Sequence, residues 1–395
     1  MTPPRTVAHV VGTVLARQGV DTVFGLMGSG NMVVTNALCA GGATFHAARH
    51  EGGAVAMADG WARVTGRVGV VSVHQGPGLT NTLTALAEAV KSGTPLLVLS
   101  GETPAAALRS NFRIDQHGLV ESVGAIAERL HSARTAAADA ARALRRAVVE
   151  RCPVVLMLPI DLQREAVPER GEVDGPPPVA VPVPLPPAPA ATAVAEAARL
   201  LAGAERPVII GGRGAVLADA RDALEALGES CGALLATSAV AHGLFSGLPY
   251  NMGISGGFAS PLAAELLPQA DVVLAFGATL NHWTTRHGGL IGPDAAVVQV
   301  DLDGRAIGGH RPVDVAIVGD AAATARALED ALGAHAAAAT GFRTPEIADA
   351  IATRRWCDEP YDDEGTDAWI DPRTLSLGLR AVLPRDVTIA VDSGH

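Results

Sequence analysis

Apolar residues recur along the first 160 residues in two alternating patterns. Two runs, at positions 154–158 and at 68–73, where Ser72 is the one polar residue, are almost entirely apolar, which is typical of strands buried on both faces of a parallel sheet. Between such runs, apolar residues spaced three or four positions apart, as at Val7, Val11 and Val14, predict amphipathic helices. Strands that alternate with helices predict a doubly wound α/β domain with a parallel sheet.

The same pattern sets the elements that we expect in this first domain, residues 1–167. Helices are predicted at residues 6–19, 31–38, 51–65, 79–91 and 139–151. Strands are predicted at 20–26, 44–46, 68–73, 95–99 and 154–158. The loops 27–30 and 74–78 each follow a strand, so we expect both at the carboxyl edge of the sheet, where open α/β folds bind ligands.

A proline-rich stretch and an alanine-rich stretch divide the rest of the chain into further predicted segments. Nine of residues 168–189 are proline, which predicts a semi-rigid linker over 168–190. A second, Rossmann-like α/β domain is expected at 191–335, with helices at 193–201 and 217–227 and strands at 207–210, 272–276 and 296–300. Residues 336–370 are expected to form a second linker. A helix at 372–383 and a strand at 387–391 are too little for a domain, so we expect 371–395 to begin a third α/β domain that is truncated here.

Composition and charge argue against a nucleic-acid-binding protein, a membrane-spanning protein and a cysteine metal site. The formal net charge is −11, and Lys91 is the only lysine, so nucleic-acid binding is not expected. No run of about 18 apolar residues is present, and we expect no membrane span. The four cysteines lie far apart without metal-ligand spacing, which indicates reduced thiols in a cytoplasmic protein.

The segment Arg49-His50-Glu51 lies where a predicted strand leads into a predicted helix. A glutamate there has two interpretations. It can be an acidic residue favoured by the positive end of the helix dipole. Alternatively, it can be a ligand-binding carboxylate at the carboxyl edge of the sheet. The residues that follow, AMADGWAR at positions 56–63, help to decide between these two interpretations of Glu51.

These residues closely resemble the thiamine-diphosphate-dependent enzymes of the acetolactate synthase and benzoylformate decarboxylase type. The motifs VFG at 23–25, GPG at 76–78 and the terminal VDSG at 391–394 also fall in the family's order, although Gly52 stands where synthases often have glutamine. The resemblance implies that Glu51 hydrogen-bonds the cofactor's aminopyrimidine and assists loss of the proton from its reactive carbon. It implies that the cofactor is also bound by Gly28, Gly76, Pro77, Gly78 and Asn81.

Two further residues, His74 and Ser29, match the decarboxylases of this family rather than the synthases. Synthases usually have Thr-Ser before the GPG turn, whereas this chain has His74-Gln75. The decarboxylase has a proton-relaying histidine at the position of His74 and a serine at that of Ser29. The resemblance therefore implies catalytic roles for Ser29, Glu51 and His74. The alternative for His74, a loop histidine with a structural hydrogen bond, remains open.

The second domain departs from the FAD-binding synthases. The loop GGRG at 211–214 resembles a dinucleotide loop only weakly. GATLN at 277–281 stands where those synthases have an arginine and paired aspartates, so FAD is doubtful. His282 and His287 lie near the place of a second decarboxylase histidine.

The family holds Mg²⁺ through a Gly-Asp-Gly motif in its C-terminal domain. This chain has no such motif, so we expect no metal ligands here and no activity of this chain alone.

The resemblance implies a thiamine-diphosphate-dependent lyase or transferase acting on a small-molecule 2-oxo acid, with decarboxylation and carboligation, as a homodimer or homotetramer. Three alternatives remain open at this point. One is a non-oxidative 2-oxo acid decarboxylase. Another is a non-catalytic or split subunit that needs a separate diphosphate-binding domain. The third is a nucleotide-binding oxidoreductase with two Rossmann-like domains.

Overall fold

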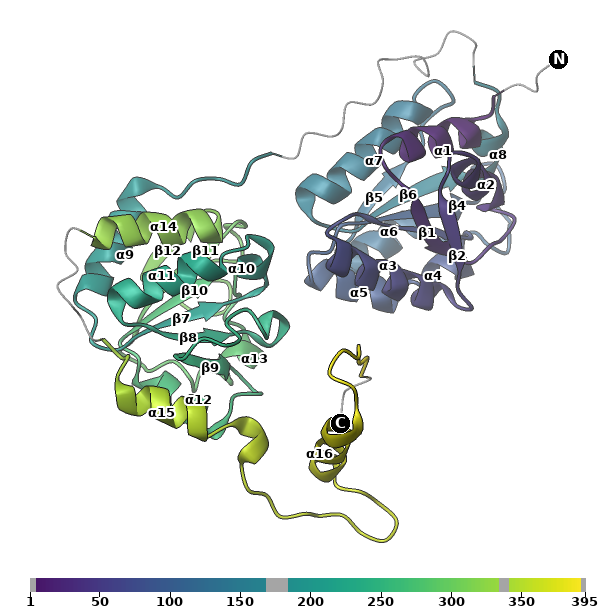
Figure 1. Ribbon diagram of the computed structural model, residues 1–395. Helices are drawn as coiled ribbons and strands as arrows, with labels where there is room; N and C mark the ends of the chain where they lie inside the picture. The colour runs from purple at the N-terminus through teal and green to yellow at the C-terminus, as the bar shows by residue number, and fades with distance from the viewer. Residues whose placement is uncertain (1–4, 168–183, 334–340, 392–395) are drawn as a thin grey trace. The chain divides into compact units, whose positions relative to one another are not determined.

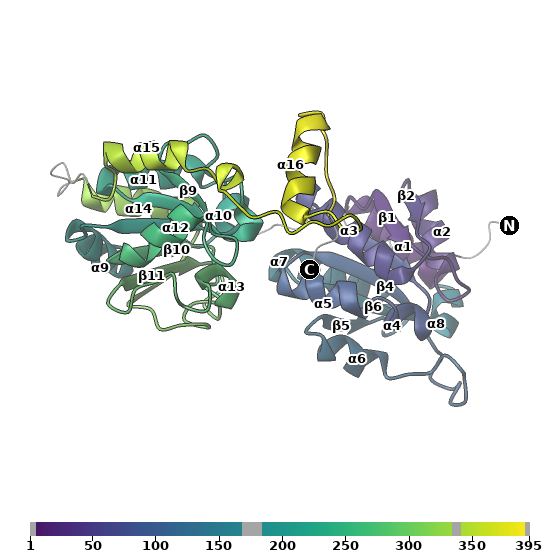
Figure 2. The ribbon, with the colours of Figure 1, turned by 90° about the horizontal axis from the view of Figure 1, so that it is seen from below.

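The computed structural model describes residues 5–167, 184–333 and 341–391. The chain divides into two compact units, Met1–Pro184 and Leu185–His395. Each unit is built around its own parallel sheet with helices on both faces (Figures 1 and 2). The predicted fold class, two doubly wound parallel-sheet α/β domains, is confirmed.

The first unit contains a six-stranded parallel sheet in the order β2-β1-β3-β4-β6-β5. The strands are β1 (Thr22–Gly25), β2 (Thr44–Ala47), β3 (Gly69–Val73), β4 (Leu96–Glu102), β5 (Ile126–Arg129) and β6 (Val154–Pro159). After β2 the chain crosses over β1 to form β3, so the strand order reverses between β1 and β3. Such a reversal opens a crevice at the carboxyl ends of the two strands, which is the usual ligand position in open α/β sheets.

Both faces of this sheet are covered because successive strand residues point to opposite sides. Val70 and Leu97 face α1 and α7, whereas Val71 and Val98 face α3 and α5. Figure 1 shows the first pair of helices on one side of the sheet and the second pair on the other. The helices of this unit are α1 (Val7–Arg17), α2 (Met32–Ala40), α3 (Glu51–Thr65), α4 (Pro77–Thr80), α5 (Leu83–Lys91), α6 (Gln116–Ser122), α7 (Ala136–Glu150) and α8 (Ile160–Arg164).

The predicted helix at 79–91 is wrong in its extent, because two helices occupy this region. Helix α4 begins two residues earlier, at Pro77, whose fixed φ suits the first turn of a helix. The hydroxyl of Thr82 donates to the carbonyl oxygen of Leu79 across 2.6 Å. This local bond competes with helix continuation and accompanies the start of α5 at Leu83.

The second unit repeats the architecture with the strand order β12-β11-β10-β7-β8-β9. Its strands are β7 (Pro207–Gly211), β8 (Leu234–Thr237), β9 (Asn251–Ile254), β10 (Val272–Phe276), β11 (Ala296–Asp301) and β12 (Val315–Val318). Its α-helices are α9 (Ala191–Ala202), α10 (Arg213–Leu217), α11 (Arg221–Cys231), α12 (Pro261–Leu266), α13 (His282–Thr285), α14 (Ala321–Leu332) and α15 (Pro345–Thr353). The predicted helix at 217–227 is therefore divided, and Asp219, with a φ of 49°, lies at the break.

Part of the segment expected to be a second linker is folded. Helix α15 packs Ile347 and Ile351 against a buried cluster on one face of the second sheet. Just before it, Phe342 is 5% exposed, and its amide donates to the carbonyl oxygen of Gly232 across 2.8 Å. The guanidinium of Arg343 lies 4.9 Å from the centre of the Tyr250 ring. These contacts join the segment to the second unit, and the alanine-rich composition does not reveal them.

The last described residues contain helix α16 (Pro372–Val382), which was expected, but not the expected strand. Residues 387–391 have no regular secondary structure, and Val387, Ile389 and Val391 are exposed. A strand requires a neighbouring strand for its backbone hydrogen bonds, and none pairs with these residues in the part of the chain that the structure describes. Residues 392–394 of the VDSG motif, like most of the proline-rich linker, lie outside the described residues. Within the described ranges, no helix is both long and apolar enough to cross a membrane.

Candidate functional site

Ser29 and His74 face each other across the point where the strand order reverses. Ser29 lies in the loop after β1, and His74 directly follows β3. Their Oγ and Nε2 atoms are 3.3 Å apart. The Nδ1 atom of His74 is 2.8 Å from the carbonyl oxygen of Gln75, which can only accept, so Nδ1 bears the hydrogen. In the neutral ring Nε2 is therefore the acceptor, and the Ser29 hydroxyl donates to it.

Glu51 is the first residue of α3 and is 7% exposed. The Nδ2 amide of Asn81 donates to Oε2 of Glu51 across 2.9 Å. No other hydrogen bond to this carboxylate occurs within the described ranges, so Oε1 remains as an acceptor at the start of the helix. The helix is capped by His50, whose Nδ1 accepts from the Gly52 amide across 3.1 Å. This cap satisfies one of the free amides at the start of the helix.

Glycines bring these side chains close together. A Cβ atom at Gly78 would lie 2.9 Å from Cβ of His74 and 3.5 Å from Oε1 of Glu51. A Cβ atom at Gly28 would lie 2.5 Å from Cδ2 of His74. Gly76 has a φ of 64°, in the left-handed region that favours glycine. The GPG turn therefore runs past the histidine and the glutamate at a distance that only residues without a side chain permit.

The structure thus gathers the residues expected from the sequence at one edge of the first sheet. Ser29, Glu51 and His74 come from the loops after β1, β2 and β3. Gly28 and Gly78 contact the His74 side chain, and Asn81 holds Glu51. Pro77 begins α4 directly after the turn.

Two residues that hold the Ser29 loop were not identified from the sequence. Asn31 directly precedes α2 but makes no side-chain capping bond to it. Its Oδ1 instead accepts from the Gly28 amide across 2.8 Å, and its Nδ2 donates to Ser72 Oγ across 3.0 Å. Gln163, in α8, donates to the carbonyl oxygen of Gly30 across 2.9 Å. Since both side chains are at most 2% exposed, the loop is held by buried amides rather than by water.

Gln75 and Gln116 hold the neighbouring turn in a similar way. Gln116, at the start of α6, is 3% exposed, and its Oε1 accepts from the Gly76 amide across 2.9 Å. The Oε1 atom of Gln75 is buried, has no hydrogen-bond partner among the residues that the structure describes, and lies against Gly30 and Gly101. The only signal in the sequence was the presence of glutamine near a glycine turn, which by itself predicts no contact between segments 40 residues apart.

Charged residues form ion pairs at the end of β4 and along α3. Burial raises the pKa of Glu102, at the end of β4, although Arg129 lies 2.7 Å from its carboxylate. Asp59, one of the acidic residues of the matched motif, pairs with Arg63 across 2.7 Å. Arg63 also pairs with Glu88 across 3.0 Å, so these two residues of the motif form a surface ion network rather than part of the site.

The loops singled out in the second unit pack against each other. A Cβ atom at Gly214 would lie 2.6 Å from Cα of Gly277, so these glycines permit close contact between the loops after β7 and β10. The rings of His282 and His287 are stacked with centroids 5.5 Å apart. Burial raises the pKa of Asp301, at the end of β11. The sequence-based prediction that FAD binding is doubtful here stays a prediction.

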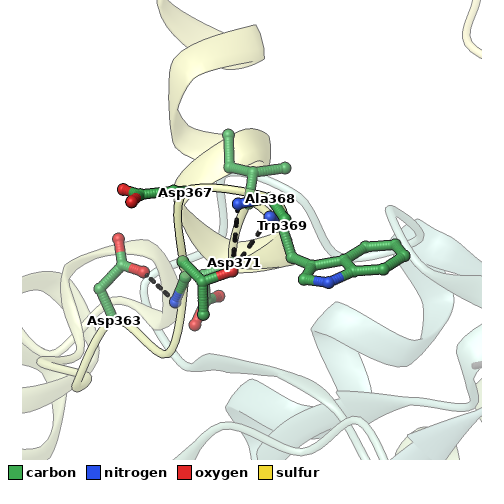
Figure 3. Close-up of a pocket in the computed structure, with 8 residues that line it drawn as sticks. Asp363, Asp367, Ala368, Trp369 and Asp371 are labelled. Carbon is green, nitrogen blue, oxygen red and sulfur yellow. Dashed lines mark hydrogen bonds between the residues drawn. The ribbon is translucent and has the colours of Figure 1, made fainter.

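A shallow pocket lies on the segment before α16, lined by residue 363 and residues 365–371 (Figure 3). The Asp363 carboxylate accepts from the Gly365 amide across 2.7 Å. Asp371 pairs with Arg373, and this hydrogen-bonded pair holds the pKa of the aspartate far below its usual range. Over the described ranges, no three His, Cys, Asp or Glu side chains are arranged to hold a metal ion.

Comparison with known protein families identifies both units. The N-terminal domain of thiamine pyrophosphate enzymes, described as their TPP-binding domain, matches residues 5–127. The central domain of the same enzymes matches residues 194–328. The chain belongs to the thiamine pyrophosphate-dependent enzymes. The first unit of this thiamine pyrophosphate enzyme is thus the one that contains Glu51 and His74.

Individual relatives within the family have different activities. A sulfoacetaldehyde acetyltransferase from Rhodobacter capsulatus is 34% identical over 97% of this chain and 67% of its own length. A probable 2-ketoarginine decarboxylase from Pseudomonas aeruginosa is 34% identical over 82% of this chain and 57% of its own. An acetolactate synthase from Mycobacterium bovis is 30% identical over 84% of this chain and 54% of its own. The chain therefore spans about two thirds, or less, of the length of these curated relatives.

Proposed function

We propose that this chain supplies the aminopyrimidine side of a thiamine diphosphate site in an enzyme that decarboxylates a 2-oxo acid and ligates the product to a second carbonyl compound. The observation on which this rests is the Glu51 carboxylate, buried at a helix start and hydrogen-bonded by Asn81 through one oxygen. The family match favours this function over that of a nucleotide-binding oxidoreductase.

The residues of the site fit the proposed cofactor. Oε1 of Glu51 is an acceptor for a proton on a pyrimidine ring nitrogen, while Oε2 is held by Asn81. The GPG turn presents backbone without a side chain beside this oxygen, so a flat ring can approach it. When bound, thiamine diphosphate supplies a nucleophilic carbon and an electron sink. The chain lacks a Gly-Asp-Gly motif, so we assign Mg²⁺ and the diphosphate to another part of the enzyme.

Proton transfer is the proposed task of the protein. With the cofactor bound, Glu51 would share a proton between Oε1 and a pyrimidine ring nitrogen, and so would assist loss of the proton from the reactive carbon. After loss of CO₂ from the 2-oxo acid, the former keto carbon would retain the electron pair of the broken bond and would take up either a proton or the carbon of a second carbonyl compound. His74 would donate that proton from Nε2 in its imidazolium form, because Nδ1 keeps its own hydrogen bonded to the Gln75 carbonyl oxygen and Nε2 faces Ser29.

The Ser29–His74 contact therefore favours a second candidate, a non-oxidative decarboxylase that releases an aldehyde. A carboligase gains from excluding a proton donor, because protonation consumes the group that it must ligate. A decarboxylase needs such a donor. The existence of an acetyltransferase, a decarboxylase and a synthase among the relatives is compatible with either outcome in this scaffold.

One experiment separates these functions. The cytoplasmic holoenzyme, purified with any further domain or subunit, would be given thiamine diphosphate, Mg²⁺ and a panel of 2-oxo acids, with sulfoacetaldehyde as a further substrate. CO₂, free aldehyde and ligated product would be measured separately. We expect CO₂ release that requires thiamine diphosphate, together with a ligated product. Release of aldehyde alone would support the decarboxylase, and no turnover of any substrate would support the non-catalytic subunit.

A further inference from the structure

One peptide group in the GPG turn is hydrogen-bonded at both ends. The carbonyl oxygen of Gln75 accepts from Nδ1 of His74 across 2.8 Å. The amide of Gly76, in the same peptide group, donates to Oε1 of Gln116 across 2.9 Å. The histidine that faces Ser29 and the buried glutamine at the start of α6 are therefore connected through a single planar unit.

Gln116 is itself fixed on the other side. Its Nε2 donates to the carbonyl oxygen of Gly101 at the end of β4 across 3.0 Å. It is the first residue of α6, and the preceding Asp115 caps that helix by accepting from the Gly118 amide across 3.0 Å. A buried amide with both ends bonded leaves little freedom for the side chain, because breaking either bond would bury an unpaired polar atom.

The peptide group would have freedom without Gln116. Gly76 has a φ of 64° and a ψ of −115°, and glycine also tolerates the conformation in which the preceding peptide is turned over. In that orientation the Gln75 carbonyl would point away from the histidine. The bond from Gly76 to Gln116 stabilises the orientation in which this carbonyl accepts from Nδ1.

We propose that Gln116 is a positioning residue that, through the Gln75–Gly76 peptide, keeps His74 in the tautomer with the hydrogen on Nδ1 and its Nε2 turned towards Ser29. This inference rests on the proposed function to the extent that His74 transfers a proton there. Donation by the Gly76 amide also polarises the peptide and makes its carbonyl a stronger acceptor for Nδ1. Gln116 touches neither Ser29 nor the His74 ring; it acts through the peptide.

The tautomer of His74 can be measured without cofactor or substrate. Histidine labelled with ¹⁵N gives distinct resonances for protonated and bare ring nitrogens. The His74 signals would be assigned by their loss in His74→Ala. The spectra would be recorded at a pH of about 8.5, above the ordinary pKa of a histidine side chain of about 6.5. We expect Nδ1 to be the protonated nitrogen in the wild-type protein and the protonated nitrogen to change, wholly or in part, to Nε2 in Gln116→Met.

A matched control exists in the second unit. Gln299 is 1% exposed, accepts from the Gly308 amide across 2.9 Å and donates to the Ala278 carbonyl across 3.0 Å. Gln299→Met removes the same kinds of bond and should leave the His74 resonances unchanged. Gln116→Glu, which retains the acceptor for Gly76, should keep the wild-type tautomer and serves if Gln116→Met does not fold. A wild-type ring protonated on Nε2, an unchanged tautomer in folded Gln116→Met, or a changed tautomer in Gln116→Glu would each overturn the proposal.

An activity measurement separates this inference from the proposed function. In the holoenzyme, Gln116→Met should lower the share of aldehyde among the products about as much as His74→Ala does, while Gln299→Met should not. A changed tautomer with an unchanged product ratio would retain Gln116 as a positioning residue and remove His74 from proton transfer. A changed ratio with the wild-type tautomer would overturn the inference and leave the role of His74 intact.

Discussion

The side-chain amide of Asn81 donates to Oε2 of Glu51 across 2.9 Å, linking the end of α4 to the start of α3. This bond makes the two carboxylate oxygens unequal. One is engaged within the protein, and the other faces the GPG turn near Gly78. The orientation of the carboxylate is therefore set before any ligand binds, as expected for a group that must meet a ring nitrogen at a fixed position.

Glu51→Gln should slow the loss of the proton from the reactive carbon of thiamine diphosphate. The substitution keeps the shape of the side chain but removes the carboxylate that exchanges a proton with the cofactor. The exchange rate of that carbon in deuterated water, followed by NMR in the holoenzyme, should fall by about 10²-fold or more. Affinity for the cofactor should change little. Glu121→Gln, on the exposed side of α6, is the control, and wild-type exchange in Glu51→Gln would exclude this residue from the mechanism.

Asn81→Ala should act through Glu51. Loss of the amide frees Oε2, so the carboxylate spends less time in the orientation that the cofactor needs. The same exchange rate should fall about tenfold, as expected for one hydrogen bond to a charged group. In the Glu51→Gln background the further loss should be much smaller, because the acceptor has already changed. Equal, additive losses in the double variant would show that Asn81 acts independently of Glu51.

His74→Ala should change what the enzyme makes more than how fast it releases CO₂. Removal of the imidazole removes the proposed proton donor, so the share of free aldehyde should fall several-fold relative to the ligated product. Ser29→Ala should produce a smaller change in the same direction, because the hydroxyl only donates to Nε2. Product analysis by chromatography checks both variants. An unchanged ratio in His74→Ala would make this residue a structural histidine of the loop.

Gly78→Ala should damage the site at little cost to the fold. The new methyl group would lie 2.9 Å from Cβ of His74 and 3.5 Å from Oε1 of Glu51, so the turn must move away from both. Cofactor affinity, measured by calorimetry on the holoenzyme, should fall at least tenfold. Gly53→Ala, in α3, has no atom within 4 Å of the new methyl group and should raise helix stability by about 0.5–1 kcal/mol without altering affinity. Equal affinities of the two variants would contradict the role given to the turn.

The stability of the first unit should depend on pH through Asp139. Burial raises the pKa of this aspartate, but hydrogen bonds from the His131 amide, Arg142 and Thr135 outweigh it and hold the pKa below its usual range. Because the native pKa is lowered, the stabilisation is complete above the unfolded value of about 3.9 and is lost as the pH falls through the native value. Asp139→Asn should be less stable at pH 7 by about 2 kcal/mol, and the difference should shrink below about pH 4. Urea unfolding at several pH values tests this, and a gap that does not change with pH would refute it.

Much of the fold follows from sequence because its signals are local. The buried strands β3, β6, β7 and β10 are almost entirely apolar runs, and the helices beside them have regular apolar spacing. The carboxyl-edge loops could be placed for the same reason, since the residues after each strand must share that edge. Four strands were not predicted. β5 contains Glu128 and Arg129, and the short β12 alternates buried and exposed residues. β8 and β9 have only four residues each, and β8 was missed although Leu234, Leu235 and Ala236 are apolar and buried.

The supporting contacts of the site could not be predicted. Asn31, Gln116 and Gln163 bond backbone groups of loops that are distant in sequence, and such pairings depend on how the loops meet in space. The helix at α15 was missed although Ile347, Ala350 and Ile351 have helical spacing, because the alanine-rich and acidic composition around them indicated a linker. The prediction of a strand at 387–391 was wrong, because apolar residues by themselves do not supply the neighbouring strand that a strand needs for its backbone hydrogen bonds.

The alternation of side chains along β3 has a consequence for insertions and deletions. Val70 and Val71 point into different layers, Ser72 lies in a buried hydrogen-bonded group with Asn31 and Thr35, and His74 follows at once. Adding or removing one residue within this strand would exchange its two faces and turn the histidine away from Ser29. Substitutions can thus alter the chemistry of this edge gradually, whereas the number of residues between Gly69 and His74 must stay fixed.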